Sequence, residues 1–520
     1  MLAHLLSATT IGIDAAPVDV EIDIQPAFEK DQINIVGLPD VAVRESQHRV
    51  RSAIVNSEFI LNGPSKIVVN LAPAETRKEG PTYDLPIALG ILAATEQLPL
   101  AAIADGLFLG ELALDGRLRA VRGVLAAALL AKERGVKFLV VPKDNAAEAA
   151  AVEELPVFGA ESLAAVVGHL RQALPIAPTV FAAPAEGADG SGSGDGELDH
   201  DFSDVSGQEG VKRALVVAAA GHHNILMIGP PGAGKSMLAK RLPTILPALS
   251  TPQAVEITKI YSVAGKLGLR GGLMRRRPYR DPHHTASYAG LVGGGVIPMP
   301  GEVSLAHLGV LFLDEFPEFD RKALEALRQP LEERTVTITR ASASTRFPAD
   351  IMLVAAMNPS PKGFDAQGGR AGQAPDPFEM RRYLDKISGP LLDRLDIHVE
   401  VNAVPWQDLA DKSRRTGSAE MRTQVEGAVA LQRARFQGTR TYHNAGMTAK
   451  QIEQWCVLTK DAELLLESAM DSLNLSARAF MRIRKLARTI ADLEGHAGPE
   501  LLEHHVAEAA SYRNLDRKYW

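Results

Sequence analysis

The chain has 520 residues, of which 46% are hydrophobic and 23% are charged, and its formal net charge is −7. This composition is typical of a globular protein, and the length predicts about two to four domains rather than a single core. The negative overall charge gives no sign of nucleic-acid binding, and the single cysteine excludes both an intrachain disulfide and a cysteine-cluster metal site.

Membrane and targeting segments are not expected. The longest apolar runs, such as Leu215–Ala220 and Ile351–Met357, are much shorter than the ~20 residues that span a bilayer. The first residues lack a basic segment followed by a sustained apolar one, so no secretory signal is expected. Together with the lone cysteine, these features predict a cytoplasmic protein with no membrane partner.

Residues 1–172 are expected to form an α+β domain. Short β-like runs, including Val18–Ile24 and Ile67–Leu71, are followed by helical stretches such as Val124–Lys132. This region contains no phosphate-binding loop of its own. Residues 173–199 are rich in Pro, Gly, Ala, Ser and acidic side chains, which cannot bury an apolar core and therefore predict a flexible linker.

Residues 200–404 alternate buried strands with helices, which predicts a doubly wound α/β domain. Its central motif, GPPGAGKS at Gly229–Ser236, follows the apolar run Asn224–Ile228 and precedes the helical run Met237–Leu242. Glycines leave backbone N–H groups open to a phosphate chain, and a helix N-terminus adds partial positive charge. The alternative is a chance glycine turn, but strand, loop and helix occur in the order that ATP binding requires.

The residues of this loop have distinct expected roles. Lys235 is expected to reach the β- and γ-phosphates of ATP, and the Ser236 hydroxyl is expected to ligate Mg²⁺. The full set of predicted nucleotide-binding residues is Gly229, Pro230, Pro231, Gly232, Ala233, Gly234, Lys235 and Ser236.

Two later strands of this domain also end in polar side chains. The buried run Gly309–Leu313 ends in Asp314 and Glu315. At the carboxyl edge of a parallel sheet, Asp314 can hold Mg²⁺ through water and Glu315 can take a proton from the water that attacks the γ-phosphate. The next run, Ile351–Met357, ends in Asn358, whose amide either positions that water or only starts a local turn.

The remaining residues, 405–520, are expected to be helical. Ser476 is a plausible N-cap for a late helix. The apolar residues of this helix recur at i, i+3, i+4 and i+7, which predicts one buried face made by Ile483, Leu486, Ala487 and Ile490.

The order of these motifs resembles that of the AAA+ ATPases. Four further strings are similar to the magnesium-chelatase-like group known as the YifB/ComM family: DPHHTAS (Asp281–Ser287), MPGEVSLAH (Met299–His307), LEALRQPLE (Leu324–Glu332) and SGPLLDRLDIH (Ser388–His398). The likeness covers nearly the whole chain. It implies an N-terminal Lon-protease-like α+β domain, a central AAA+ doubly wound α/β domain and a C-terminal helical lid.

The resemblance also implies roles for single residues. Asn358 matches the sensor-1 residue, Arg394 the arginine finger that reaches the γ-phosphate of a neighbouring subunit, and Arg478 the sensor-2 arginine of the lid. Guanidinium groups stabilise the charge that spreads over a transferred phosphoryl group, although either arginine could instead be a surface residue of a basic helix. A finger supplied to a neighbour requires a ring, so we expect a homo-hexamer whose isolated subunits bind ATP but hydrolyse it poorly.

Part of the central domain also looks like the minichromosome maintenance helicases, in which a hairpin carries a basic residue into the ring's pore. The matching stretch is Thr335–Ser342, with Arg340 at the expected tip. A second candidate for DNA contact is the basic run Arg275, Arg276 and Arg277, where cations for phosphate lie beside an aromatic ring. A solvated basic loop, or a contact with the acidic linker, is the alternative for this second stretch.

Two further features bear on the chemistry. The adjacent His283 and His284 lack the spacing of a closed tetrahedral site, so no metal other than Mg²⁺ is expected. KEGPTYDLPIALG (Lys78–Gly90) and GELALDGRLRAVRGVLAAALLA (Gly110–Ala131) resemble the proteolytic domain of Lon, whose enzymes need a serine nucleophile and a lysine base. The matching positions hold Thr82 and Leu125, and leucine cannot take a proton. The N-terminal domain is therefore expected to be a binding or assembly module.

These features together predict an ATPase that uses ATP and Mg²⁺ and acts as a ring motor on DNA. The family resemblance implies a helicase or branch-migration factor of natural transformation and recombination, with branched or single-stranded DNA and recombination proteins as candidate partners. One alternative is a remodeller of proteins in the manner of the magnesium-chelatase motor subunit. Another is a non-catalytic adaptor, against which the intact Lys235, Asp314, Glu315 and Arg394 argue.

Overall fold

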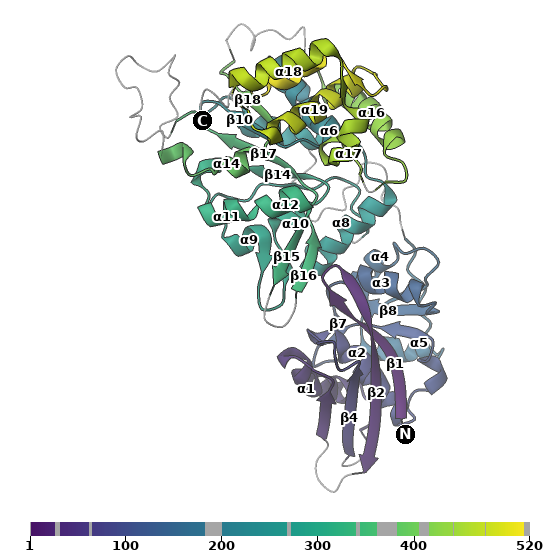
Figure 1. Ribbon diagram of the computed structural model, residues 1–520. Helices are drawn as coiled ribbons and strands as arrows, with labels where there is room; N and C mark the ends of the chain where they lie inside the picture. The colour runs from purple at the N-terminus through teal and green to yellow at the C-terminus, as the bar shows by residue number, and fades with distance from the viewer. Residues whose placement is uncertain are drawn as a thin grey trace. The chain divides into compact units, whose positions relative to one another are not determined.

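The computed structural model describes residues 2–26, 32–61, 65–181, 200–267, 272–339, 344–360, 382–404, 415–439, 441–473 and 475–513. The chain forms two compact units (Figure 1). Unit 1 comprises Met1–Gly196, Ser250–Arg276 and Ala341–Phe347, and unit 2 comprises Glu197–Leu249, Arg277–Arg340 and Pro348–Trp520. Across the described ranges, no helix is both long enough and apolar enough to cross a bilayer.

Unit 1 is built on a mixed seven-stranded sheet with the order β3-β4-β2-β1-β5-β8-β9. Strand β2 pairs antiparallel with β1 and β4, and the other neighbours pair parallel. The strands are β1 (Leu2–Ile11), β2 (Asp14–Pro26), β3 (Gln32–Val36), β4 (Ser65–Ala72), β5 (Gly106–Phe108), β8 (Phe138–Pro142) and β9 (Val157–Ala160), with a separate pair β6 (Glu111–Leu112) and β7 (Leu118–Arg119). The strands predicted at Val18–Ile24 and Ile67–Leu71 are thus confirmed.

The helices of unit 1 pack against its strands. They are α1 (Val41–Asn56), α2 (Asp84–Ala94), α3 (Val124–Glu133), α4 (Lys143–Ala149) and α5 (Leu163–Leu170). Every residue of α2 is buried, and α2 packs against β1 and β2, so this helix is apolar on all sides rather than amphipathic. Helix α3 confirms the helix predicted at Val124–Lys132.

A segment from the middle of the chain also belongs to unit 1. Helix α8 (Thr251–Ala264) packs against α3, and Lys259 forms an ion pair with Asp14 of β2. The carbonyl of Ser262 in α8 accepts the N–H of Gly123 at 3.3 Å. The sequence pattern placed residues 200–404 in one domain and gave no sign that α8 belongs to unit 1. The domain boundaries expected from the sequence stay a prediction.

Unit 2 contains a five-stranded sheet with the order β11-β14-β17-β10-β18, and all of its neighbouring strands are parallel. The strands are β11 (Tyr279–Arg280), β14 (Val310–Leu313), β17 (Met352–Met357), β10 (Ile225–Ile228) and β18 (Ile397–Glu400). Each residue of β10, β14 and β17 is buried, as expected for strands covered on both faces. The prediction of a parallel α/β sheet is confirmed.

Helices and short hairpins surround this sheet. They are α6 (Glu209–Gly221), α7 (Lys235–Arg241), α9 (Tyr288–Val292), α10 (Glu302–Leu305), α11 (Arg321–Ala326), α12 (Arg328–Glu333), α14 (Gly389–Leu392), and the pair β12 (Gly293–Gly294) and β13 (Met299–Pro300). Strand β15 (Thr335–Thr339) also belongs to unit 2, whereas most of β16 (Ser344–Pro348) falls within the residues of unit 1.

The C-terminal part of unit 2 is helical, as predicted. It holds α16 (Ser418–Arg435), α17 (Ala449–Trp455), α18 (Lys460–Leu473), α19 (Ala477–Leu493), α20 (Glu503–Ser511) and the short strands β19 (Val457–Leu458) and β20 (Glu500–Leu501). Ser476 caps α19, because its hydroxyl accepts the N–H of Ala479 at 3.2 Å. The predicted apolar face is also confirmed, since Ile483, Leu486, Ala487 and Ile490 are fully buried.

Candidate nucleotide-binding site

Three adjacent strands of unit 2 place polar side chains at one edge of the sheet. Strand β10 leads into the loop Gly229–Ser236, β14 ends before Asp314 and Glu315, and β17 ends before Asn358. Because β14, β17 and β10 are parallel neighbours, their carboxyl ends lie at the same edge. This is the edge at which open parallel sheets bind ligands.

The loop after β10 requires glycine for two reasons. A Cβ on Gly229 would lie 2.1 Å from the carbonyl oxygen of Val401, which no side chain tolerates. Gly232 and Gly234 have φ values of 80° and 93°, a region that other residues rarely adopt. The backbone therefore turns tightly and enters α7 with no side chain obstructing its N–H groups, as a phosphate chain would need.

Lys235 is held by protein oxygens. Its ammonium group donates to the carbonyls of Gly229 at 2.5 Å and Pro230 at 3.0 Å, and to Oδ1 of Asn358 at 3.1 Å. Burial lowers the pKa of Lys235, against the attraction of Asp314. A buried cation with three oxygen partners at this edge is well placed to exchange them for phosphate oxygens.

The magnesium-ligand candidates also meet. The hydroxyl of Ser236 donates to Oδ2 of Asp314 at 2.7 Å, and Oδ1 of Asp314 accepts the N–H of Glu315 at 2.9 Å. Hydroxyl and carboxylate oxygens are the donors that Mg²⁺ accepts alongside phosphate and water. With the open loop and Lys235, this donor set fits a magnesium nucleotide.

Glu315 has a partner that the sequence analysis missed. Its side chain is 53% exposed, and its Oε2 lies 2.9 Å from Nδ1 of His284. His284 follows β11, the neighbour of β14, so its strand also ends at this edge. The sequence analysis weighed His284 only as a metal ligand; the strand before it was the signal that could have placed it beside Glu315.

The two candidate arginines lie in different surroundings. Arg394 follows α14, is 4% exposed, and donates to the carbonyl of Pro390 and to the carboxylate of Glu332. Burial lowers the pKa of Arg394, and the nearby charges of Arg328 and Arg478 act in the same direction. Arg478 itself is exposed in the first turn of α19.

The DNA candidates divide into two groups. Arg340 lies outside the described residues, between β15 and β16. Arg277 is occupied in the fold, because it donates to the carbonyls of Pro247 and Leu308, each at 2.7 Å, and burial lowers its pKa to about 10. Arg275 and Arg276 have exposed side chains.

Tyr279, the aromatic residue next to this basic run, packs inside the protein. The ring of Tyr279 stacks on that of Phe312, with centroids 6.3 Å apart. It is therefore not positioned to stack on a nucleic-acid base.

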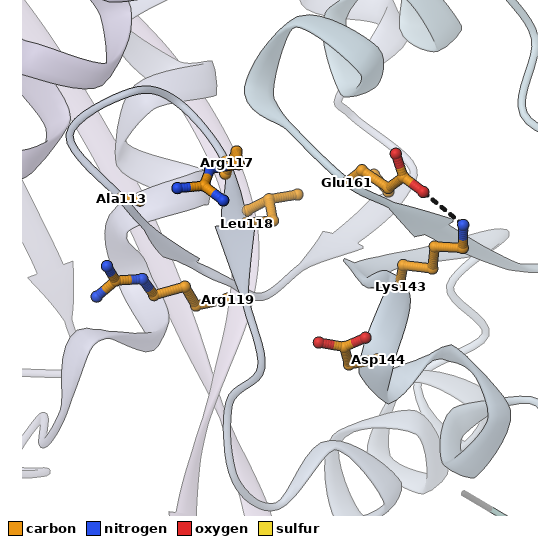
Figure 2. Close-up of a pocket in the computed structure, with 8 residues that line it drawn as sticks. Ala113, Arg117, Leu118, Arg119, Lys143, Asp144 and Glu161 are labelled. Carbon is orange, nitrogen blue, oxygen red and sulfur yellow. Dashed lines mark hydrogen bonds and ion pairs between the residues drawn. The ribbon is translucent and has the colours of Figure 1, made fainter. Parts of the chain in front are cut away.

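In unit 1, the Lon-like positions do not form a catalytic pair. Thr82 lies in a short 3₁₀ turn, where its carbonyl accepts the N–H of Gly110 at 2.9 Å, and Leu125 is fully buried in α3. A cavity of about 470 Å³ in this unit is lined by Ala113, Arg117, Leu118, Arg119, Lys143, Asp144, Ala160 and Glu161 (Figure 2). Its lining contains no hydroxyl or thiol nucleophile.

Comparison with known proteins agrees with this geometry. The family model described as "Magnesium chelatase, subunit ChlI" matches residues 201–409, "Subunit ChlI of Mg-chelatase" matches 20–145, and "Magnesium chelatase, subunit ChlI C-terminal" matches 415–513. The chain is 43% identical over 522 residues to the competence protein ComM of Haemophilus influenzae, covering 99% of this chain and 98% of that protein. It is 41% identical over 519 residues to YifB of Escherichia coli (strain K12), with the same coverage of 99% and 98%.

A more distant similarity involves a replication protein. The DNA replication licensing factor mcm-6 of Caenorhabditis briggsae is 23% identical over 315 residues, which cover 56% of this chain and 33% of that protein.

Proposed function

Because the chain belongs to the YifB/ComM family of magnesium-chelatase-like AAA+ proteins, we propose that it is an ATP-hydrolysing ring motor that acts on DNA. The observation that carries the ATPase part is the convergence of Lys235, Asn358, Ser236 and Asp314 through hydrogen bonds at one edge of a parallel sheet. These four side chains follow three separate strands along the chain, so their meeting is a property of the fold and not of one motif.

Each residue at this edge has a proposed task. Bound magnesium nucleotide supplies the phosphoryl group and the ion that neutralises its charge. Lys235 binds the terminal phosphates, and Ser236 and Asp314 hold the ion. Glu315 accepts the proton of the attacking water, and the amide of Asn358 orients that water.

The hydrolytic site is completed by a second subunit. Arg394 is assigned to the γ-phosphate of the neighbouring subunit, and Arg478 to the nucleotide of its own subunit, within a homo-hexameric ring. In the single chain, Arg394 is held by Glu332. An isolated subunit is therefore expected to bind ATP and hydrolyse it slowly, because an arginine finger contributes about 10³–10⁵-fold to the rate of phosphoryl transfer.

The DNA-directed part rests on the relatives and on basic side chains. One relative is named a competence protein and another a DNA replication licensing factor. Arg340, between β15 and β16, is the first candidate for a pore contact, and the exposed Arg275 and Arg276 are the second. Arg277 is the weakest of the basic run, since backbone carbonyls already occupy its guanidinium group. A cytoplasmic location and recombination proteins as partners belong to the same proposal.

ATP hydrolysis measured with and without forked DNA tests both parts. The wild-type protein is expected to hydrolyse ATP faster when DNA is present, and Glu315→Gln to bind ATP without releasing phosphate. Arg340→Ala is expected to keep basal hydrolysis but to unwind forked DNA more slowly. Unchanged phosphate release by Glu315→Gln would contradict the assigned base, and unwinding by Arg340→Ala at the wild-type rate would contradict the pore contact.

The alternative is a protein remodeller, favoured by the family models named after a chelatase subunit. That function predicts an ATPase rate that responds to a protein partner and not to DNA at moderate salt. The same assay therefore separates the two functions.

A further inference from the structure

Three ligand-type side chains from distant parts of the chain meet at the opposite, amino-terminal edge of the unit 2 sheet. His222 is the C-cap of α6, just before β10, and Asp350 lies just before β17. His443 precedes the 3₁₀ turn Asn444–Gly446 in the C-terminal helical region. One candidate ligand atom from each of the three side chains lies within 4.8 Å of the other two.

The distances in this cluster are long for hydrogen bonds and close to those between zinc ligands. His222 Nε2 lies 3.5 Å from Asp350 Oδ1, and His443 Nε2 makes a 3.4 Å hydrogen bond with Asp350 Oδ2. Hydrogen bonds to a carboxylate are usually about 2.7–2.9 Å, and the buried His222 Nε2 has no hydrogen-bond partner. Ligands held about 2.0–2.1 Å from a tetrahedral zinc ion lie about 3.3–3.4 Å from each other. Each of the two nitrogen–oxygen distances is close to this value.

The side chains are also of the types that bind zinc, and they are largely buried. Their exposed fractions are only 12–13%. Two imidazoles and one carboxylate are a recurrent zinc ligand set, with water in the fourth position.

The backbone holds these positions without an ion. His222 has a left-handed φ of 58° and closes α6 by donating its N–H to the carbonyl of Ala218. The N–H of Asp350 donates to Nδ1 of His307 at 3.0 Å, and its carbonyl accepts the N–H of Leu308 at 2.7 Å. Ligands fixed in this way lose little conformational freedom when a metal binds.

We propose that His222, Asp350 and His443 bind one zinc ion, which fastens the C-terminal helical region to the amino-terminal edge of the parallel sheet. Imidazole nitrogen favours zinc over the hard ion Mg²⁺. This site is separate from the magnesium position at Ser236 and Asp314, and it stands whether or not the protein acts on DNA. It also revises the expectation that Mg²⁺ is the only metal of this chain.

The bound ion would restrain α19, the helix that carries Arg478. The turn after His443 is already joined to this helix: Lys485 donates to the carbonyl of Ala445 at 2.8 Å, and Asn444 donates to the hydroxyl of Thr489 at 3.1 Å. An ion on His443 therefore connects the sheet to α19 through one short turn.

Arg334 opposes the ion and provides a diagnostic variant. Its Nε lies 3.6 Å from Asp350 Oδ1, and its guanidinium group packs against Gly446. A neighbouring positive charge disfavours a bound cation. Removing that charge with Arg334→Gln should tighten zinc binding by about tenfold or more.

A second cluster of similar composition provides the control. Nε2 of His504 and Nε2 of His505 lie 2.9 Å and 3.0 Å from the same oxygen of Glu494. Because Nδ1 of His505 accepts the N–H of Leu502, its Nε2 carries the proton and has no lone pair for a metal. His504→Gln, at an exposed position, should therefore leave zinc binding unchanged.

The test uses the full chain, stripped of metal by a chelator and titrated by calorimetry with Zn²⁺ and by visible absorption with Co²⁺. Wild type and His504→Gln should each bind one equivalent, with the absorption of tetrahedral cobalt. His443→Gln and Asp350→Asn should bind at least about tenfold more weakly. Zn²⁺, but not Mg²⁺, should raise the melting temperature of the wild type and not that of His443→Gln.

Circular dichroism establishes which variants fold. If a ligand variant does not fold, the titration of the wild type still decides whether the zinc site exists. Absence of one-equivalent binding by the wild type overturns the site and leaves an ion-pair cluster between the sheet and the helical region. Unchanged binding by a folded Asp350→Asn protein, or weaker binding by Arg334→Gln, overturns it as well. DNA plays no part in these readouts, so they do not depend on the proposed motor function.

Discussion

Both edges of the unit 2 sheet carry polar side chains next to β10 and β17, but the two edges arrange them differently. At the carboxyl edge, Lys235 and Asn358 lie 3.1 Å apart, and Ser236 and Asp314 lie 2.7 Å apart. At the amino edge, roughly 25 Å away along β17, Asp350 lies 3.4 Å and 3.5 Å from its histidines.

This difference separates two kinds of ligand site. The carboxyl edge satisfies its own polar groups, so a nucleotide exchanges one set of hydrogen bonds for another and can leave again after reaction. The amino edge leaves the buried Nε2 of His222 without a hydrogen-bond partner, so an ion there would give this nitrogen a contact that it lacks. The comparison indicates that the two proposed ligand sites, which lie at opposite ends of β10 and β17, differ in the spacing of their polar side chains.

The largest effect is expected beside the amino edge, at Asp492. Its fully buried carboxylate binds Arg435 at 2.5 Å and 2.8 Å, and Arg488 and Asn444 also donate to it. Asp492→Ala leaves buried cations unpaired and should lower the free energy of unfolding by about 3–5 kcal/mol. Urea denaturation measures this loss, with the exposed Asp471→Ala as a control that should change little. Equal stability of the two variants would mean that this cluster does not hold the helical region.

The next largest effect is expected at the carboxyl edge. Lys235→Ala removes the cation that contacts Asn358 and both loop carbonyls, and should lower the ATPase rate by about 10²–10³-fold. The exposed Lys240→Ala on the same helix is the matched control and should keep wild-type activity. Zinc binding at the amino edge should be the same in both variants. A change in zinc affinity with Lys235→Ala would show that the two edges are not independent.

A smaller effect is expected for His284, which contacts the Glu315 carboxylate at 2.9 Å. His284→Ala frees this carboxylate and should raise DNA-independent ATP hydrolysis by about tenfold, since a charge-assisted hydrogen bond of this kind contributes about 1.5–3 kcal/mol. Stimulation by DNA should shrink in proportion. Steady-state phosphate release with and without DNA measures both quantities, and a fall in basal rate would mean that His284 instead orients Glu315 for reaction.

The last prediction concerns the reactivity of Cys456 rather than activity or stability. The residue is fully buried, and burial raises the pKa of its thiol to about 12. Because the thiolate is the reactive form, an alkylating reagent at pH 8 should label the folded protein far more slowly than the urea-unfolded protein. The rate of labelling followed by mass spectrometry tests this. Fast labelling of the folded chain would indicate that the helical region opens readily.

The sequence was sufficient for features that depend on local patterns. The buried strands β10, β14 and β17 are continuous apolar runs, and the polar residues that follow them are read directly from the chain. The N-cap at Ser476 and the buried face of α19 follow from helical spacing in the same way.

The remaining features depend on contacts between distant segments. The local sequence around His222 and around His443 contains no metal-binding motif. Only the fold brings these two histidines close to Asp350. The Arg394–Glu332 ion pair and the membership of α8 in unit 1 arise likewise from tertiary packing. No period or motif encodes these contacts, so they require the structure.

Helix α19 carries residues that belong to both of the regions compared above. Its first turn carries Arg478, whose charge acts on Arg394, and its later turns carry Lys485 and Thr489, which hold the turn after His443. Its 17 residues form a rod of about 25 Å. A tilt of this helix at its first turn would therefore also move the residues that hold the turn after His443.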